Sequence, residues 1–200
     1  FFLHPDDGIR DAQESRGLGD VYKRQVHDTN KFYYTVWDIR MTTHLNGEVL
    51  PNWVDHNRHM NLAYYVLAFD QATDNFFQSF GIDDRYRRNS NCSTFAGNIH
   101  VYYKRELNLA EEFYIDCTLL GFDDKRIRHM NCMFHKSDQT EIAVFESLQL
   151  HVSLEERRVC AMPGTLLNNL EKLQAGQPKM CLPKEIGESI SKPSIHTSFT

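Results

Sequence analysis

A single long segment with helical spacing stands out in the pattern of apolar and polar positions. Between Leu62 and Phe80, core-type side chains recur at steps of three and four residues, which is the period of an α-helix with a buried face. The recurring positions are Leu62, Tyr65, Val66, Phe69, Ala72, Thr73, Phe76, Phe77 and Phe80. Asn61 is suited to cap the first turn and Gly81 to end the helix. Because the first half is apolar on nearly all sides, we expect other structure to wrap around it.

Alternation with a period of two predicts strands on the C-terminal side of this helix. The four expected strands cover residues 94–106, 113–119, 127–134 and 142–152. One or two more are expected within 31–49, with a turn at Asn46 and Gly47. Short turns at 110–111, 121–124 and 137–139 would join the four strands as antiparallel neighbours. The charged residues 83–91 have the composition of a loop.

One long helix followed by a run of antiparallel strands is an α+β pattern. A curled antiparallel sheet wrapped around the helix is the arrangement that would cover it. We assign this domain to residues 26–163 and expect a short helix and a loose tail over 164–200. Residues 1–25 carry many charges and no apolar period, and they resemble translated adapter sequence. We therefore expect them to be a non-native or disordered leader.

The composition narrows the classes of partner. The net charge is −5 and no basic cluster is present, which argues against binding to nucleic acid or to an anionic membrane. No apolar run approaches the roughly 20 residues of a membrane span. The five cysteines are scattered, odd in number and without a Cys-x-x-Cys pair. We therefore expect reduced thiols, no metal site and a cytoplasmic location.

A polar cluster directly before the helix holds the candidate chemistry: Asp55, Asn57, Arg58, His59 and Asn61. Free amides and the macrodipole at a helix start favour negative charge there. Carboxylate and imidazole groups beside a buried helix are costly for folding unless they are paired or used. No Gly-x-Ser-x-Gly or His-Glu-x-x-His segment occurs, so a serine-triad hydrolase or a zinc protease is not indicated. A carboxylate acting as base or nucleophile is the chemistry that this cluster indicates.

Three motifs follow one another closely: Trp-Val-Asp-His-Asn-Arg-His-Met-Asn (53–61), Tyr-Tyr at 64–65 and Phe-Asp-Gln-Ala-Thr-Asp at 69–74. They resemble those of the hot-dog-fold acyl-CoA thioesterases, and most closely the carnitine-catabolism or betainyl-CoA type. The resemblance extends to Gly-Phe-Asp-Asp-Lys-Arg at 121–126 and to residues 145–152, and it spans roughly 32–163. The sequence departs from the pattern at Arg58, where the family has Gly, and at Asn98, where it has Glu.

The resemblance implies a role for each candidate residue. Asp55 would be the catalytic base or nucleophile, with Asn57 and His59 orienting the substrate or water. The expected substrate contacts are Asn61, Tyr65, His100 and Arg58. The substrate would be an acyl-CoA, with a short polar acyl group such as betainyl as one option. It implies no separate cofactor, because CoA is part of the substrate, and it implies a homodimer or a dimer of dimers.

Other interpretations stay open at this point. Asp55 could merely cap a turn, and His59 and His100 could be structural histidines. A hot-dog hydratase would carry Asp-x-Asn-Pro-x-His, which this sequence lacks, since no Pro follows Asn57. A non-catalytic acyl-CoA-binding module is harder to set aside, because Arg58 replaces the motif glycine.

Overall fold

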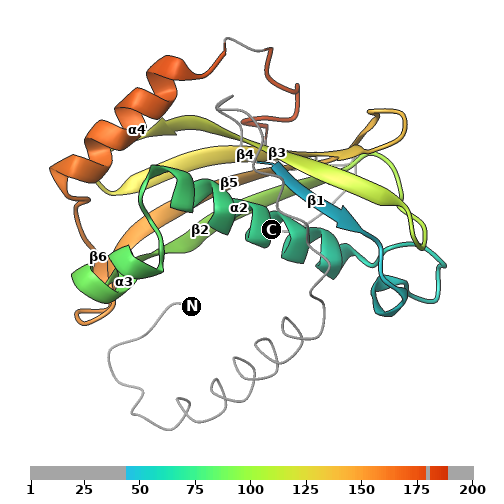
Figure 1. The fold of residues 1–200 in the computed structure, drawn as a ribbon, viewed down its shortest axis with the longest axis horizontal. Helices are drawn as coiled ribbons and strands as arrows, with labels where there is room; N and C mark the ends of the chain where they lie inside the picture. The colour runs from blue at the N-terminus through green and yellow to red at the C-terminus, as the bar shows by residue number, and fades with distance from the viewer. Residues whose placement is uncertain (1–43, 179–180, 189–200) are drawn as a thin grey trace, which may run out of the picture. The chain divides into compact units, whose positions relative to one another are not determined.

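The computed structural model describes residues 44–178 and 181–188 of the chain (Figure 1). Two compact units are distinguished, 1–33 and 34–200, and all described residues lie in the second. The expected leader at 1–25 and most of the expected strand region at 31–49 therefore lie outside the described residues. Among the helices that are described, none is both long and apolar enough to cross a membrane.

Helix α2 (Leu62–Phe80) forms where the spacing predicts it and lies across one face of the sheet (Figure 1). The side chain of Asn61 accepts a hydrogen bond from the backbone N–H of Ala63, which caps the first turn. Gly81 ends the helix with a φ of 110°, a left-handed conformation that costs glycine little. The buried face comprises Tyr65, Ala68, Phe69, Ala72, Thr73, Phe76, Phe77 and Phe80. Leu62, which we expected on this face, is 64% exposed.

The sheet is antiparallel, with the strand order β1-β3-β4-β5-β2 and with the short β6 beside β5. Its strands are β1 (His44–Glu48), β2 (Cys92–Tyr103), β3 (Glu112–Phe122), β4 (Arg126–His135), β5 (Glu141–Ser153) and β6 (Arg158–Val159). A 3₁₀ turn, η1 (Pro51–Trp53), leads from β1 toward α2. The expected α+β fold, a curled antiparallel sheet around a long helix, is confirmed (Figure 1).

Strands β3 and β5 show how the sheet is covered on both faces. The predicted alternation in β3 is confirmed, because Phe113, Ile115, Cys117 and Leu119 are all buried. In β5 one face is buried except at the strand ends, whereas Glu146, Leu148 and Leu150 on the other face are half-buried. Phe145 stacks on Phe69 of α2 with ring centroids 5.1 Å apart. The neighbouring Val144 belongs to a separate buried cluster with Met130 and Cys132.

The connection between β2 and β3 differs from the prediction. The turns after β3 and β4 join antiparallel neighbours as expected, but β2 does not pair with β3. It pairs with β5 instead, from Cys92 opposite Ser153 to Tyr103 opposite Ala143. The segment at 104–111 therefore crosses to the far side of the sheet, which a turn prediction from local residue types cannot show.

The predicted turn at Asn46 and Gly47 is wrong, because both residues lie in β1. Gly47 faces Phe113 of β3 in the ladder. A Cβ atom at this position would lie 2.4 Å from the Phe113 ring, so only glycine lets the ring lie against the backbone of β1. The glycine is needed for this close approach and does not mark a turn.

The predicted loop at 83–91 is also wrong. Residues Asp84–Ser90 form helix α3. The side chain of Asp83 caps it by accepting a hydrogen bond from the backbone N–H of Tyr86, and Asn91 ends it with a φ of 50°. Both ends carry suitable residues, but the segment has no apolar period and buries no side chain, so periodicity missed it.

Helix α4 (Gly164–Gly176) is the expected C-terminal helix, and it buries Leu166 and Leu170. After it, the side chain of Gln177 binds both the N–H and the carbonyl of Leu119. Residues 181–188 contribute Ile186, which packs on the cluster around Val144. The backbone N–H of Gly187 donates to Glu146 of β5.

Between α2 and the sheet lies a small polar network inside the apolar core. The amide of Asn131 donates to Thr73 Oγ1 at 2.9 Å and to the carbonyl of Phe69 at 3.1 Å. Its oxygen lies 3.1 Å from His129 Nδ1. His129 is fully buried, and its ring lies among Phe76, Phe77 and Phe145. Burial disfavours the imidazolium and lowers the pKa of His129 to about 4.

We predict that this histidine makes the fold sensitive to acid. Its pKa is about 4 in the folded chain and 6.5 as the ordinary value, so the unfolded chain takes up the proton first as the pH falls. The stability that comes from neutral His129 is therefore fully present above pH 6.5 and is lost toward pH 4. The loss is roughly 3 kcal/mol for the whole shift in pKa. Urea unfolding of the wild type and of His129→Gln at several pH values would measure this loss.

The readout is the difference in pH dependence and not the absolute stability, since the glutamine variant will be weaker at every pH. His129→Gln should lose less stability than the wild type between pH 6.5 and 4. Equal losses in the two proteins would show that His129 is not the acid-sensitive group.

Candidate active site

The segment before α2 forms a tight turn around the carboxylate of Asp55. Oδ1 accepts the backbone N–H of Asn57 at 2.8 Å, and Oδ2 accepts the side-chain amide of Asn61 at 2.9 Å. The backbone of Asp55 accepts from Arg58 N–H and donates to the carbonyl of His59. An isolated bridge between Val54 and Met60 closes the loop. The turn therefore holds both carboxylate oxygens in fixed directions.

These hydrogen bonds also set the charge of the site. Asp55 is half-buried, and the bond from the Asn57 backbone is the main cause that lowers the pKa of Asp55 below its ordinary value. The amide of Asn61 and the nearby His56 and His59 act in the same direction. The carboxylate is therefore ionised at neutral pH and available as a base or nucleophile.

Arg58 occupies the turn in a left-handed conformation, with a φ of 68°. Glycine adopts this conformation readily, whereas other residues pay about 1–2 kcal/mol for it. The position where the family motif has Gly is therefore one that favours glycine, and this chain keeps the same backbone with an arginine. Its side chain is exposed.

Asn61 connects the turn to the helix. Its amide binds Asp55, while its side-chain oxygen and its carbonyl accept the N–H groups of Ala63 and Tyr64. Of the first three helix amides, only that of Leu62 makes no hydrogen bond within the described part of the chain. Leu62 N–H is therefore the amide of these three that can donate to a substrate oxygen.

A pocket of about 290 Å³ opens beside the helix start. Its walls come from the end of the turn, the first turn of α2, the end of β2 and the link that follows β2. The lining residues are His59, Met60, Leu62, Tyr65, Tyr103, Lys104, Arg105 and Glu106. Two predicted site residues, His59 and Tyr65, line this pocket. Asp55, Asn57, Arg58 and Asn61 belong to the adjoining turn and are not among the lining residues.

Tyr65 and Tyr103 form an aromatic wall of the pocket, with rings edge to face and centroids 5.2 Å apart. The hydroxyl of Tyr65 accepts the backbone N–H of Leu107 at 3.0 Å. Burial raises the pKa of Tyr65 to about 12, so it stays a neutral phenol. Tyr65 therefore also holds the link after β2 against α2.

His100 is not brought to this pocket. It lines a second pocket of about 270 Å³, whose other lining residues are Asn98, Arg128, Glu146, Leu148, Gly187 and Glu188. The expected grouping of His100 with Asp55 and His59 is therefore not supported by the pocket geometry. Tyr103 and Glu106, which line the first pocket, are not among the predicted site residues, although both stand at the end of the predicted strand 94–106.

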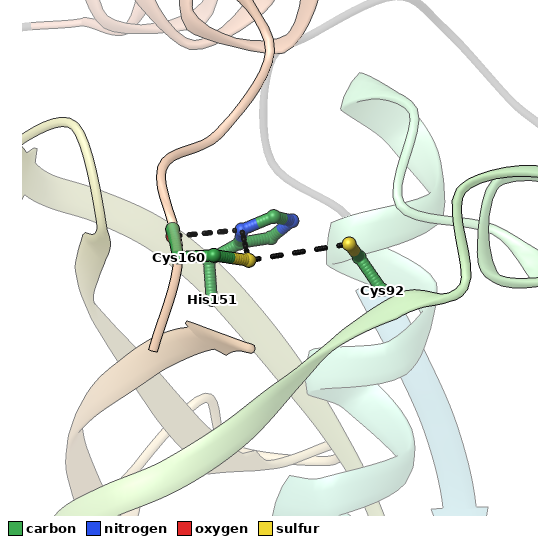
Figure 2. A group of neighbouring side chains, drawn as sticks. All are labelled: Cys92, His151 and Cys160. Carbon is green, nitrogen blue, oxygen red and sulfur yellow. Dashed lines mark hydrogen bonds between the residues drawn. The ribbon is translucent and has the colours of Figure 1, made fainter. Parts of the chain in front are cut away.

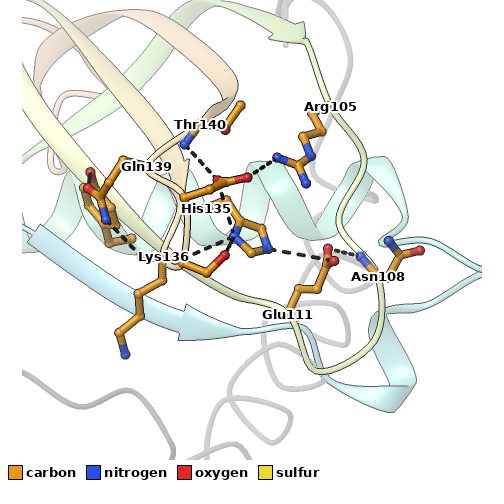
Figure 3. Close-up of polar contacts among 10 residues, drawn as sticks. Arg105, Asn108, Glu111, His135, Lys136, Gln139 and Thr140 are labelled. Atoms are coloured by element: carbon orange, nitrogen blue, oxygen red, sulfur yellow. Dashed lines mark hydrogen bonds and ion pairs between the residues drawn. The ribbon is translucent and has the colours of Figure 1, made fainter.

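The Lys and Arg side chains that line the first pocket are already paired. Lys104 binds Glu141 and Glu185, the latter at 2.9 Å. Arg105 donates to Asp138 at 2.7 Å (Figure 3). In the same network His135 lies 3.8 Å from Glu111, which accepts the backbone N–H of Asn108 (Figure 3). These cations are therefore balanced locally and are weaker candidates for binding CoA phosphates.

Of the described residues, those grouped closely enough to share a metal ion are Cys92, His151 and Cys160, and none lines this pocket.

Comparison with known proteins gives a consistent picture. A family model described as the thioesterase-like superfamily matches residues 49–170. Betainyl-CoA thioesterase of Pseudomonas aeruginosa is 31% identical over 147 residues, which cover 74% of this chain and 92% of that protein. L-carnitine dehydrogenase/betainyl-CoA thioesterase of Agrobacterium fabrum is 32% identical over 147 residues, and the match covers 29% of its length.

Solved structures agree in fold. A hypothetical protein of Staphylococcus aureus in complex with CoA aligns with a TM-score of 0.73 and 24% identity, covering 80% of this chain and all of that one. A protein of Pseudomonas putida KT2440 that is assigned as a thioesterase aligns with a TM-score of 0.64 and 28% identity. The alignment covers 74% of this chain and 95% of that one. The resemblance inferred from the motifs is confirmed.

Proposed function

Since this chain belongs to the thioesterase-like superfamily, we propose that it hydrolyses an acyl-CoA to the free acid and CoA, with Asp55 as base or nucleophile. The observation that carries the proposal is the ionised carboxylate of Asp55, which the turn holds in place at the start of α2 beside an open pocket. Leu62 N–H and the positive end of the helix dipole would stabilise the oxyanion that develops on the thioester carbonyl.

The neighbouring residues have supporting parts in this proposal. Asn57 and Asn61 keep the carboxylate oriented by hydrogen bonds to its two oxygens. His59 Nδ1 lies 3.2 Å from the carbonyl of Met60. If Nδ1–H donates to this carbonyl, Nε2 carries a lone pair and can accept a hydrogen bond from the attacking water. Glu106 is a second candidate for the base, because it lines the pocket itself and Asp55 does not.

We predict that Asp55→Asn lowers kcat by about 10² or more while KM changes little. The amide keeps the size and part of the hydrogen bonding but has no basicity. Release of free CoA thiol from a panel of short, polar and long acyl-CoAs would measure the effect. Asp84→Asn, which removes an exposed carboxylate on α3, is the matched control and should retain wild-type turnover.

The same panel with Glu106→Gln separates the two candidate bases. Full activity in Asp55→Asn together with a large loss in Glu106→Gln would assign the base to Glu106. If neither variant loses turnover of a substrate that the wild type hydrolyses, a carboxylate mechanism at this site is wrong.

We further propose a small cationic acyl group, of which betainyl is the type acted on by the named relatives. A quaternary ammonium is attracted to aromatic faces, and Tyr65 and Tyr103 line the pocket. Glu106 adds a carboxylate to the same wall, whereas Lys104 and Arg105 are paired with acidic residues. The pocket therefore presents aromatic rings and a carboxylate that attract a cation, while the positive charges of its lining Lys and Arg are already paired.

A neutral substrate of the same shape tests this preference. The acyl group of 3,3-dimethylbutyryl-CoA replaces the ammonium nitrogen of betainyl-CoA with carbon and so removes only the charge. We expect kcat/KM to favour betainyl-CoA by about tenfold, the scale of one cation–π contact. Tyr103→Leu should reduce this ratio and Tyr103→Phe should keep it. A ratio of one in the wild type would refute the cationic preference and leave hydrolysis itself untouched.

We also propose that two copies pair along strand β2. Within the described residues β2 is the last strand of the sheet, and it exposes Phe95, Ile99 and Tyr103 at 42%, 41% and 47%. An apolar edge strand of this length invites pairing with a second chain. We expect a dimer in sedimentation velocity at micromolar concentration, and Ile99→Lys should shift it toward monomer. Leu109→Lys, which changes an exposed apolar residue in the link after β2, should not. A monomeric wild type would contradict the pairing.

A further inference from the structure

Three side chains that are far apart in the sequence meet at the end of strand β5: Cys92, His151 and Cys160 (Figure 2). The strand register explains why. Cys92 is paired with Ser153, and side chains two residues apart in a strand share a face, so Cys92 and His151 lie on the same face. Cys160 directly follows β6, and its backbone N–H donates to the carbonyl of His151. One sheet face thus carries all three groups.

The distances between the three groups are those of a ligand set. The two sulfurs lie 4.0 Å apart, and Cys160 Sγ lies 3.4 Å from His151 Nδ1 (Figure 2). The ligating atoms of all three residues lie within 4.8 Å of one another. A tetrahedral zinc ion with bonds of about 2.3 Å to sulfur and about 2.0 Å to nitrogen requires edges of about 3.8 Å between sulfurs and about 3.6 Å from sulfur to nitrogen.

We propose that Cys92, His151 and Cys160 bind a zinc ion, with the fourth position taken by water. Two thiolates and one imidazole are ligands that zinc prefers, and oxygen-seeking cations such as Mg²⁺ do not suit them. To reach the tetrahedral edges, Cys92 would move inward and His151 Nδ1 would turn from the Cys160 carbonyl, 3.0 Å away, toward the sulfurs. The proposal does not depend on thioesterase activity, because none of the three residues lines the pocket beside α2.

The surroundings of His151 suit a ligand. His151 is 1% exposed, so its ring is fixed by packing. The hydroxyl of Tyr86 in α3 lies 2.7 Å from Nε2. Nδ1 lies 3.0 Å from the carbonyl oxygen of Cys160 and 3.4 Å from its sulfur, so a bound ion would replace the hydrogen bond to that carbonyl. A phenol can accept as well as donate, so Nε2–H can then donate to Tyr86 while Nδ1 offers its lone pair to the ion. Metal-binding histidines are commonly oriented by such a bond on the second nitrogen.

The binding step balances without a redox partner. Each thiol gives up its proton and each sulfur donates an electron pair to the ion, while neutral His151 shifts its proton to Nε2. Two protons leave per ion bound.

The site would fasten three segments of the chain. Cys92 begins β2, His151 lies near the end of β5, and Cys160 follows the short β6. In the described residues β6 is held to the sheet only by pairs at Val152 and Ser153. An ion at this position would hold the turn after β5 to the edge strand.

Protection from alkylation tests the proposal on the unmodified chain. With free zinc at 100 times its Kd, iodoacetamide should label Cys92 and Cys160 roughly 100-fold more slowly than in the apo protein. The exposed Cys181 should be labelled at the same rate in both states and serves as the internal control. Peptide mass spectrometry reads each cysteine separately. Equal labelling of Cys92 and Cys160 with and without zinc would overturn the proposal.

Cobalt substitution and variants identify the ligands. Co²⁺ should give thiolate charge-transfer absorption and the intense visible bands of a tetrahedral site, with one ion per chain. Cys92→Ser should abolish these bands and Cys181→Ser should leave them intact. If both variants keep the bands, the ligand assignment is overturned. A Cys92–Cys160 disulfide that forms under mild oxidation despite saturating zinc would instead make the pair a redox couple and also overturn the proposal.

Discussion

The packing of α2 against the sheet is the contact on which the rest of this structure depends. A nineteen-residue helix with three phenylalanines in its last two turns cannot stay in water, and the curved sheet is the surface that covers it. The same packing fixes where the helix begins. Asn61 and the turn around Asp55 are therefore placed by the core behind them, and the position of the carboxylate relative to the pocket follows from the burial of residues well away from it.

The core also contains polar groups that apolar packing alone would not need. The amide of Asn131 donates to Thr73 and to the Phe69 carbonyl, and its oxygen contacts His129, which burial among aromatic rings keeps neutral. Such a network fixes the register between helix and sheet more narrowly than aromatic side chains alone, because the Asn131 amide and the Thr73 hydroxyl have defined partners on α2. The tendency toward acid sensitivity is the cost of that arrangement.

The elements that the sequence predicts well are those governed by short-range periodicity. The bounds of α2 and the alternation in β3 both depend on neighbouring residues. The errors lie where distant residues decide. Gly47 is a strand residue because of Phe113, and β2 leaves its sequence neighbour to pair with β5. The site divides in the same way. Asp55, Asn57 and Asn61 form one local turn, whereas Glu106 reaches the pocket, and Cys160 reaches Cys92, only through the sheet topology.

The pairing of β2 with β5 has a consequence for the order of events during synthesis. Strands β3, β4 and β5 form a continuous series of hairpins that can assemble as they emerge. Strand β2 leaves the ribosome earlier but must wait for β5, the last long strand, before it can pair. A nascent chain therefore carries β2 without its partner strand, and Phe69 of α2 without the Phe145 ring on which it stacks, until β5 has been made.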